Sequence, residues 1–384
     1  MLQLVAGVVL CLCPAEFFAQ SPGTSTSFSF WYEEWQSGVT ISKLQAANVI
    51  IGAPSSAVPE IHKNGKHALQ YVTYYQSHYK SAFLKDSSDL ADVGFQVNGQ
   101  VEKSVFGGQD NYVLCPNSVE LKARVLRYLE GSLKQGFDGY FVDNTFLDPP
   151  AHLACGAAHP HIKSGALGGR AYLDLIAAVH QKMKQQNPSA ILITNPGAPG
   201  WSDKLAAGSP SLWDVSDYVL WESYGYSSEA GPNHDRWKQT IEQSFIYAAQ
   251  PDKARRILAL SYPRSIAEAR FAFAVARIFG FPCSANLGEK QQGKDEKGGH
   301  FGIFTNDLPA DLGAALGSLP DRSSPLLHRS FTNGEIFANS GTTTEHIRVH
   351  AGATILLGGV PIKGSASPEL ELPPMTAAVV LARR

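Results

Sequence analysis

The stretch "GFDGYFVDNTFLD" occupies residues 136–148. Its apolar and aromatic residues continue to position 142, and the chain then becomes polar at Asp143 and Asn144. A short apolar run bounded by glycine and by polar residues is typical of a buried strand. A carboxylate and an amide at the end of such a strand either cap it or form half of an active site, and the surrounding sequence has to distinguish these two interpretations.

Seven further runs of the same kind are spaced along the chain, and helical periodicity separates several of them. The eight runs lie at residues 28–35, 48–54, 68–75, 139–144, 190–197, 218–225, 256–263 and 280–288. Their nearly continuous hydrophobicity indicates strands that are covered on both faces. We therefore predict an α/β fold, a (β/α)8 TIM barrel over residues 25–320, with a doubly wound open sheet as the alternative.

Two segments depart from this alternation. Residues 77–115 form a long insertion after the third strand, for which we expect a small hairpin at the catalytic face of the barrel. Residues 323–384 contain short alternating runs with Asn-Gly and Gly-Gly turns and no helical pattern. The sequence predicts a small all-β C-terminal domain there, a β-sandwich packed on the barrel.

Composition excludes several classes of protein. The 384 residues carry a net charge of −2, and only 17% are charged, without a basic stripe. Nucleic acid is therefore not an expected partner. A hydrophobic content of 44% argues against disorder.

The N-terminus reads as a targeting segment. The apolar run "LQLVAGVVLCLC" is followed by small residues, which predicts a signal peptide over residues 1–20, although no Lys or Arg precedes it. We expect a secreted or periplasmic protein without a membrane anchor. An oxidising compartment permits a disulfide, for which Cys115 and Cys155 are the better pair, although spacing alone does not establish it.

Polar residues stand at the ends of several predicted strands. Because functional side chains of a barrel gather at the carboxyl ends of its strands, we expect Asp143, Asn195 and Glu222 to meet there. Two facing carboxylates suit glycoside hydrolysis, in which one attacks the sugar and the other protonates the leaving oxygen. Asn195 would bind a substrate hydroxyl. The other strand-end candidates are Glu33, Glu34, Tyr75, Asn144 and Tyr262.

The first strand carries two adjacent acids, of which only one can enter the barrel mouth. Alternation groups Glu34 with Phe30, and Glu33 with Ser29. Small side chains suit a narrow interior, so Glu33 is the favoured substrate-binding residue, with an ion pair inside the barrel as the structural alternative.

Aromatic rings near the strand ends form a second group of candidates. Sugar rings pack their C–H faces on aromatic planes, so Trp35, Trp201, Trp221, Tyr75 and Tyr224 are predicted to bind substrate. The competing interpretation is that these rings belong to the core.

The His-rich segment "HLACGAAHPH", residues 152–161, matches no standard zinc spacing, and no nucleotide-binding loop or serine elbow is present. We predict no metal and no cofactor.

The motifs "GFDGYFVDN" and "YVLWESYG" resemble the fourth- and sixth-strand motifs of barrel glycosidases. The resemblance is to glycosyl-hydrolase-like family 15 and alpha-galactosidase-type barrels, whose C-terminal β-sandwich the tail "RSFTNGEIFANSG" resembles. It covers most of residues 25–384 and implies Asp143 as nucleophile and Glu222 as general acid/base.

The leading hypothesis is thus a secreted glycoside hydrolase acting on an oligo- or polysaccharide. A non-catalytic carbohydrate-binding protein on the same scaffold is the first alternative, and a metal-dependent hydrolase using the His-rich segment is the second. The sequence predicts neither the sugar nor the oligomeric state.

Overall fold

The structure is a computed structural model. It describes residues 30–32, 47–74, 76–78, 81–97, 100–103, 111–145, 168–200, 211–227, 234–285, 312–349, 354–357, 360–363 and 369–381. The predicted signal peptide lies outside these residues.

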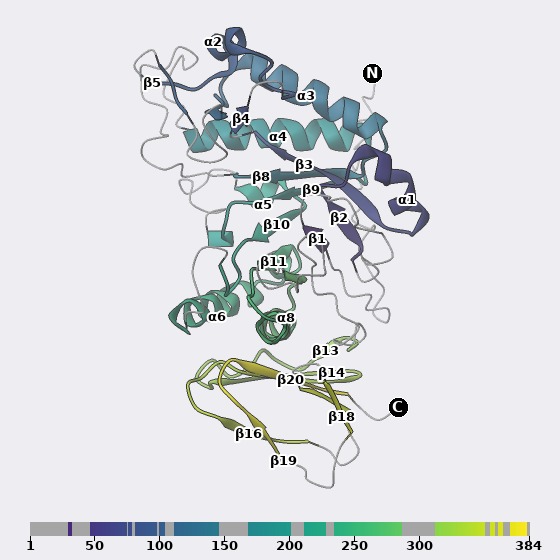
Figure 1. The fold of residues 1–384 in the computed structure, drawn as a ribbon, viewed down its shortest axis with the longest axis vertical. Coiled ribbons are helices and arrows are strands. Elements are labelled where there is room, and N and C mark those ends of the chain that lie inside the picture. The colour runs from purple at the N-terminus through teal and green to yellow at the C-terminus, as the bar shows by residue number, and fades with distance from the viewer. Residues whose placement is uncertain are drawn as a thin grey trace, which may run out of the picture.

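A parallel sheet forms the centre of the described chain (Figure 1). Its eight strands are hydrogen-bonded in the order of the sequence, and each coincides with one of the eight predicted runs, except that the third strand begins one residue before its run. They are β1 (Phe30–Tyr32), β2 (Val49–Ile51), β3 (His67–Thr73), β8 (Gly139–Asp143), β9 (Ile191–Thr194), β10 (Tyr218–Trp221), β11 (Ile257–Ser261) and β12 (Cys283–Ala285).

The sheet curls back on itself. The first and last strands, β1 and β12, lie close together, whereas the edge strands of an open doubly wound sheet lie far apart. Apolar side chains fill the enclosed space and leave almost none of their surface exposed. They are Phe30, Val49, Ile51, Leu69, Phe141, Ile191, Ile193, Leu220, Leu258 and Leu260, which we call the interior cluster. Such a filled interior is a packed core rather than a pore.

Helices follow most of the strands and cover the outer face of the sheet (Figure 1). α3 (Val119–Lys134) is capped by Ser118, whose side-chain oxygen accepts the N–H of Leu121, and its apolar face packs beside α4 (Gly168–Gln186). The helices are η2 (Ser55–Ala57), α1 (Val58–Lys63), α3 (Val119–Lys134), α4 (Gly168–Gln186), α5 (Leu212–Val215), α6 (His234–Ala248), α7 (Pro251–Ala254) and α8 (Ile266–Phe279).

The insertion after β3 contains two small antiparallel pairs, which confirms the expected hairpin. Arg124 of α3 holds the insertion, because its guanidinium binds Asp89 at 2.8 Å as well as Glu120 at 2.8 Å on its own helix. The elements are β4 (Gln76–His78), η3 (Ser87–Asp89), α2 (Leu90–Val93), β5 (Gln96–Val97), β6 (Gln100–Val101) and β7 (Asn111–Val113).

In the described residues from position 312 onward, every regular element is a strand. One antiparallel sheet has the order β13 (Ala315–Leu316), β14 (Leu326–Phe331), β15 (Gly334–Asn339), β20 (Thr376–Leu381), β17 (Thr354–Leu357), β18 (Val360–Lys363). A second pairs β16 (Glu345–Arg348) with β19 (Glu369–Leu372). β13 lies before residue 323, where the all-β segment was expected to begin. Its two residues pair with the end of β14 and so belong to the same sheet.

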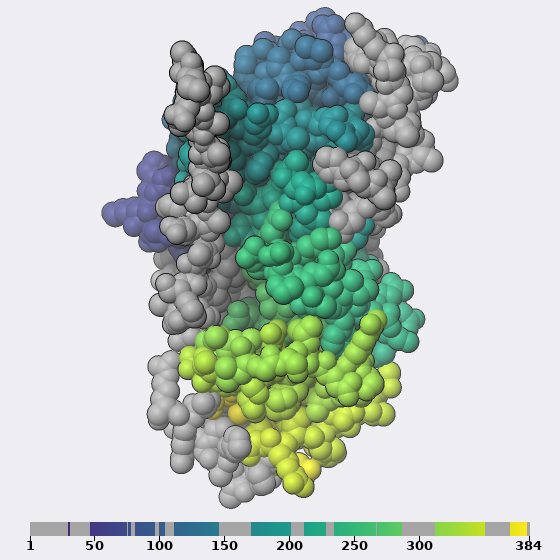
Figure 2. Space-filling view, turned by 180° about the vertical axis from the view of Figure 1, so that it is seen from behind, coloured from purple at the N-terminus to yellow at the C-terminus, as the bar shows by residue number. Residues whose placement is uncertain are grey.

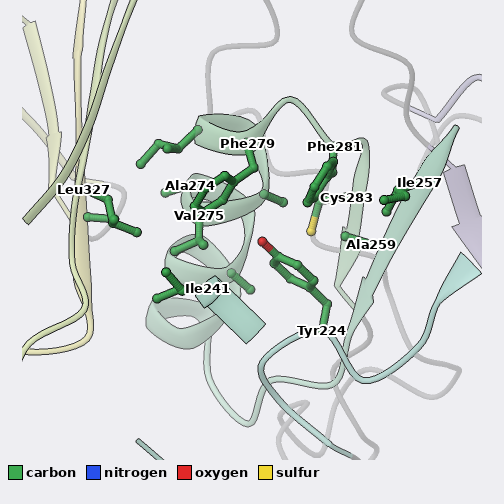
Figure 3. Close-up of a cluster of buried hydrophobic side chains, with 14 of the residues drawn as sticks. Tyr224, Ile241, Ile257, Ala259, Ala274, Val275, Phe279, Phe281, Cys283 and Leu327 are labelled. Carbon is green, nitrogen blue, oxygen red and sulfur yellow. The ribbon is translucent and has the colours of Figure 1, made fainter. Parts of the chain in front are cut away.

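The C-terminal antiparallel sheet, yellow-green to yellow in Figure 2, lies directly against the rest of the described chain. It packs against α8, and the helix and the sheet share one hydrophobic cluster (Figure 3). Leu327 of β14 contacts one side of α8, while Cys283 and Ala259 of the parallel sheet lie on the other side. Arg329 of β14 also donates to the backbone oxygen of Ile278 in α8. In the part of the chain that the structure describes, no helix is long and apolar enough to cross a membrane.

Candidate active site

Five polar side chains stand one layer above the interior cluster. Alternate residues of a strand share a face, so a residue two positions beyond an inward-facing apolar residue also faces inward. On five successive strands that position is polar. On four of them it lies at or just past the carboxyl end, where barrel enzymes place their active sites, and on β3 it lies two residues before the end. The five residues are Tyr71 after Leu69, Asp143 after Phe141, Asn195 after Ile193, Glu222 after Leu220 and Tyr262 after Leu260.

Asp143 ends β8 and is 9% exposed. Its Oδ2 accepts hydrogen bonds from the Tyr71 hydroxyl and, at 3.2 Å, from Asn144 Nδ2, while its Oδ1 accepts one from Asn195 Nδ2 at 2.7 Å. Burial raises the pKa of Asp143, and the negative charge of Glu222 acts in the same direction, against the lowering effect of the Tyr71 and Asn195 donors.

Glu222 lies one residue past the end of β10 and has its own donors. Its Oε2 accepts from Asn195 Nδ2 at 2.9 Å, and its Oε1 accepts from the Tyr262 hydroxyl at 2.7 Å. Burial and the neighbouring Glu222 charge raise the pKa of Tyr262 far above its ordinary value. Tyr262 therefore keeps its proton around neutral pH and donates its hydroxyl to Glu222.

Asn195 connects the two acids. Because one nitrogen donates to both, at 2.7 and 2.9 Å, the two accepting oxygens lie less than about 6 Å apart. The predicted meeting of Asp143, Asn195 and Glu222 at one end of the sheet is confirmed. A continuous chain of hydrogen bonds thus runs from Tyr71 through both carboxylates to Tyr262.

The backbone turns sharply immediately after each acid. Asn144 has a φ of 54° and Ser223 a φ of 58°, in the left-handed region that residues other than glycine enter rarely. Asn144 tolerates this conformation better than most residues. Strained residues of this kind cluster at functional sites, and here they end the strand directly behind each carboxylate.

Several predicted substrate-binding residues, namely Glu33, Glu34, Trp35, Tyr75 and Trp201, lie outside the described residues. The choice between Glu33 and Glu34 therefore stays a prediction, and one described residue of β1 bears on it. Phe30 belongs to the interior cluster, so the inward face of β1 is the one that alternation groups with Glu34.

Trp221 and Tyr224 do not face the carboxylates. Trp221 is 4% exposed and Tyr224 is 0% exposed, and both belong to the cluster around α8. Figure 3 shows Tyr224 in this cluster. Their rings meet edge to face with centroids 4.9 Å apart, and the Tyr224 hydroxyl bonds to Ser244 at 3.1 Å. Rings without accessible surface cannot pack on a sugar, so the competing core interpretation holds for these two.

Tyr71 is not among the residues predicted from the sequence, and Tyr262 is among them without a role. Tyr71 is 38% exposed, and its ring stacks on Phe141 at a centroid distance of 5.6 Å. The signal was available in β3, where Tyr71 shares a face with Leu69. The position of Tyr71 in the sequence conceals its role, because Tyr71 lies two residues before the end of β3 and pairs in register with Phe141 rather than with Asp143.

Among the described residues, no group of three or more His, Cys, Asp or Glu is arranged to hold a metal ion. The His-rich segment at 152–161 lies outside them. Cys115 is buried, but Cys155 also lies outside the described residues, so their pairing stays a prediction.

No family model matches the sequence, and no curated protein does. Solved structures with a similar fold include trehalose-6-phosphate hydrolase (TreA) of Bacillus licheniformis, with 9% identity, a TM-score of 0.52, and coverage of 93% of this chain and 99% of that one. Amy13B of Eubacterium rectale matches with 11% identity and a TM-score of 0.51 over 93% and 94% of the two chains. An alpha-amylase from Anoxybacillus matches with 10% identity and a TM-score of 0.50 over 90% and 88%. This chain therefore has a mixed α/β fold shared with glycoside hydrolases that are TIM barrels.

Proposed function

We propose that this protein is a glycoside hydrolase that cleaves O-glycosidic bonds of an oligo- or polysaccharide, with Asp143 as nucleophile and Glu222 as general acid/base. One observation carries the proposal: two carboxylates at the carboxyl ends of β8 and β10 share the amide of Asn195, which follows β9 between them. The fold shared with glycoside hydrolases supports it without identifying the sugar.

The short separation of the two acids favours retention of configuration. Retaining glycosidases hold their carboxyl groups about 5 Å apart, whereas inverting enzymes leave room for a water between them. In the proposed reaction, Asp143 attacks the anomeric carbon while Glu222 protonates the departing oxygen, which gives a covalent glycosyl–Asp143 ester. Glu222 then removes a proton from water, the water oxygen attacks the anomeric carbon, and the ester bond breaks to release the sugar and the Asp143 carboxylate.

The hydrogen bonds favour this assignment of roles. Asp143 has donors from Tyr71, Asn195 and Asn144, and donors stabilise the ionised form that a nucleophile needs. Its raised pKa nevertheless means that the carboxylate forms only at a higher pH than is usual for aspartate. We therefore expect activity to fall on the acid side as Asp143 becomes protonated.

The test begins with the release of reducing ends from a panel of polysaccharides, followed by NMR of the first product to determine its anomeric configuration. Asp143→Asn and Glu222→Gln are then compared on dinitrophenyl glycosides of the sugar identified. The Glu222 variant should retain turnover, because this leaving group needs no protonation, and added azide should accelerate it. The Asp143 variant should be inactive on every substrate.

Other outcomes are equally informative. The opposite pattern would reverse the two roles, and an inverted product would remove the covalent step. Sugar binding by the wild type without turnover on any probe would favour the non-catalytic alternative. The absence of both binding and turnover across the panel would overturn the proposal.

We further propose a closed (β/α)8 barrel over residues 25–320, a C-terminal β-domain over residues 323–384, and export directed by residues 1–20. The curled parallel sheet and the antiparallel sheets beneath α8 support the first two. N-terminal sequencing of the protein recovered from the medium or periplasm tests the third, since it should begin near residue 20.

A further inference from the structure

We propose that Asn195 does not bind substrate but positions the two carboxylates, with the turn Asn195-Pro196-Gly197 as a preformed amide clamp. The inference concerns the same site as the proposed function, and in its catalytic consequence it rests on that function. It assigns a role to the amide that differs from the hydroxyl-binding role predicted from sequence.

The turn fixes the orientation of the amide. Asn195 Oδ1 accepts the backbone N–H of Gly197 at 2.9 Å, an Asx-turn that the sequence Asn-Pro-Gly suits well. Gly197 has a φ of 85°, which a glycine adopts at little cost. With the oxygen held on this side, the NH2 group must point to the opposite side, where both carboxylates lie.

Asn195 has no free donor for a sugar. The residue is 2% exposed, and each of its two amide hydrogens serves one carboxylate. Its backbone N–H donates to the oxygen of Val142 at 2.9 Å, and its backbone oxygen accepts the N–H of Thr145 at 2.9 Å. The residue is thus attached to the chain on both sides of Asp143, and a substrate hydroxyl could bind it only by displacing a carboxylate.

The amide of Asn195 lies between two acids and reduces their electrostatic repulsion. Two carboxylates less than about 6 Å apart repel each other and resist ionising together. A neutral group that donates one hydrogen bond to each acid offsets part of this repulsion and holds both acceptors at a fixed spacing. Loss of the amide should therefore raise the pKa of Asp143.

The experiment measures that titration directly. Carbon NMR of protein labelled at the aspartate carboxyl carbon follows Asp143, whose signal is assigned by its loss in Asp143→Asn. Asn195→Asp and Asn195→Ser both keep an oxygen for the Gly197 N–H, so the turn can form without the amide donor. The pKa of Asp143 should rise by about 1–2 units in Asn195→Ser, and by more in Asn195→Asp.

The C-terminal sheet contains a matched control. Asn339 is fully buried, its Oδ1 accepts the N–H of Gly341 at 2.9 Å, and its Nδ2 donates to the backbone oxygens of Thr343 and Leu372 at 2.7 and 2.8 Å. Asn339→Ser removes the same kind of double donor and should destabilise the fold. It should leave the titration of Asp143 unchanged.

A measurement on the wild type avoids dependence on any variant. The two side-chain amide protons of Asn195 should exchange slowly with solvent, and their resonances should move as Asp143 titrates. The proposal is overturned if these resonances do not respond to pH, or if the Asp143 titration in Asn195→Ser stays within a few tenths of a unit of wild type.

These readouts need no substrate, so they separate the two proposals. A shifted titration in a protein that cleaves no glycoside would leave the clamp in place and remove the hydrolase. If the protein is active, Asn195→Ser should lower kcat much more than it changes KM. A raised KM with unchanged kcat would instead make Asn195 a substrate ligand and overturn the clamp.

Discussion

Tyr71→Phe removes one hydroxyl from the site and keeps the ring that stacks on Phe141. The lost hydroxyl donates to Oδ2 of Asp143, a buried carboxylate whose pKa is already raised by burial. Its removal should raise that pKa further, since one of the donors to the ionised form disappears.

The magnitude follows from the acceptor. A hydrogen bond to a charged group contributes about 1.5–3 kcal/mol, and because Tyr71 is 38% exposed, water can replace part of it, so we expect a loss of about 1–2 kcal/mol at neutral pH. That corresponds to about one pKa unit for Asp143.

The sign of the pH dependence distinguishes this cause from lost packing. An acid whose pKa in the folded protein is raised destabilises the fold above that pKa, and the cost disappears as the pH falls and the acid is protonated. The stability difference between wild type and Tyr71→Phe should therefore be largest at about pH 7 and shrink below about pH 4 to less than about 1 kcal/mol.

Urea unfolding at a series of pH values measures this difference. Tyr172→Phe is the control, because that buried hydroxyl donates to the backbone oxygen of Leu114 at 3.2 Å, a neutral acceptor. Its loss should cost about 1 kcal/mol at every pH. A stability loss in Tyr71→Phe that is equally independent of pH would refute the charge-based reasoning.

Three further predictions concern other contacts. Tyr262→Phe removes the donor to Glu222 Oε1 and should lower kcat/KM at least about tenfold in steady-state kinetics on the substrate identified. An unchanged kcat/KM would show that the contact has no part in the reaction. Asp138→Ala should cost about 1–3 kcal/mol at neutral pH and less in acid. Burial alone would raise the pKa of Asp138, but the nearby His67 and hydrogen bonds from the Ala68 N–H and His62 lower it overall, so its stabilisation is lost as the pH falls through that lowered value. Unfolding titrations that show a constant difference would contradict this. Gly139→Ala should prevent folding, because a Cβ there would lie 1.9 Å from the backbone oxygen of Ile191 where β8 meets β9. A variant that is folded by circular dichroism would show that the two strands can separate.

The sequence by itself determined the strands of the parallel sheet and which residues of a strand share a face. Apolar runs long enough for one strand each, separated by helical periodicity, gave the eight strands in their order, since burial on both faces requires continuous hydrophobicity. Alternation with a period of two placed Asp143 with Phe141 and Glu222 with Leu220, as the structure has them.

Only the tertiary structure decided which of two equivalent faces points inward. Alternation states which residues share a face, but the interior of the curled sheet and its helical cover are both apolar, so hydrophobicity could not choose for β1 or assign Trp221 and Tyr224 to the core. The same limit hid the role of Asn195. Its amide nitrogen donates to two carboxylates that lie 52 and 27 residues away in sequence. Only the curling of the sheet brings the oxygens of both acids to this one nitrogen.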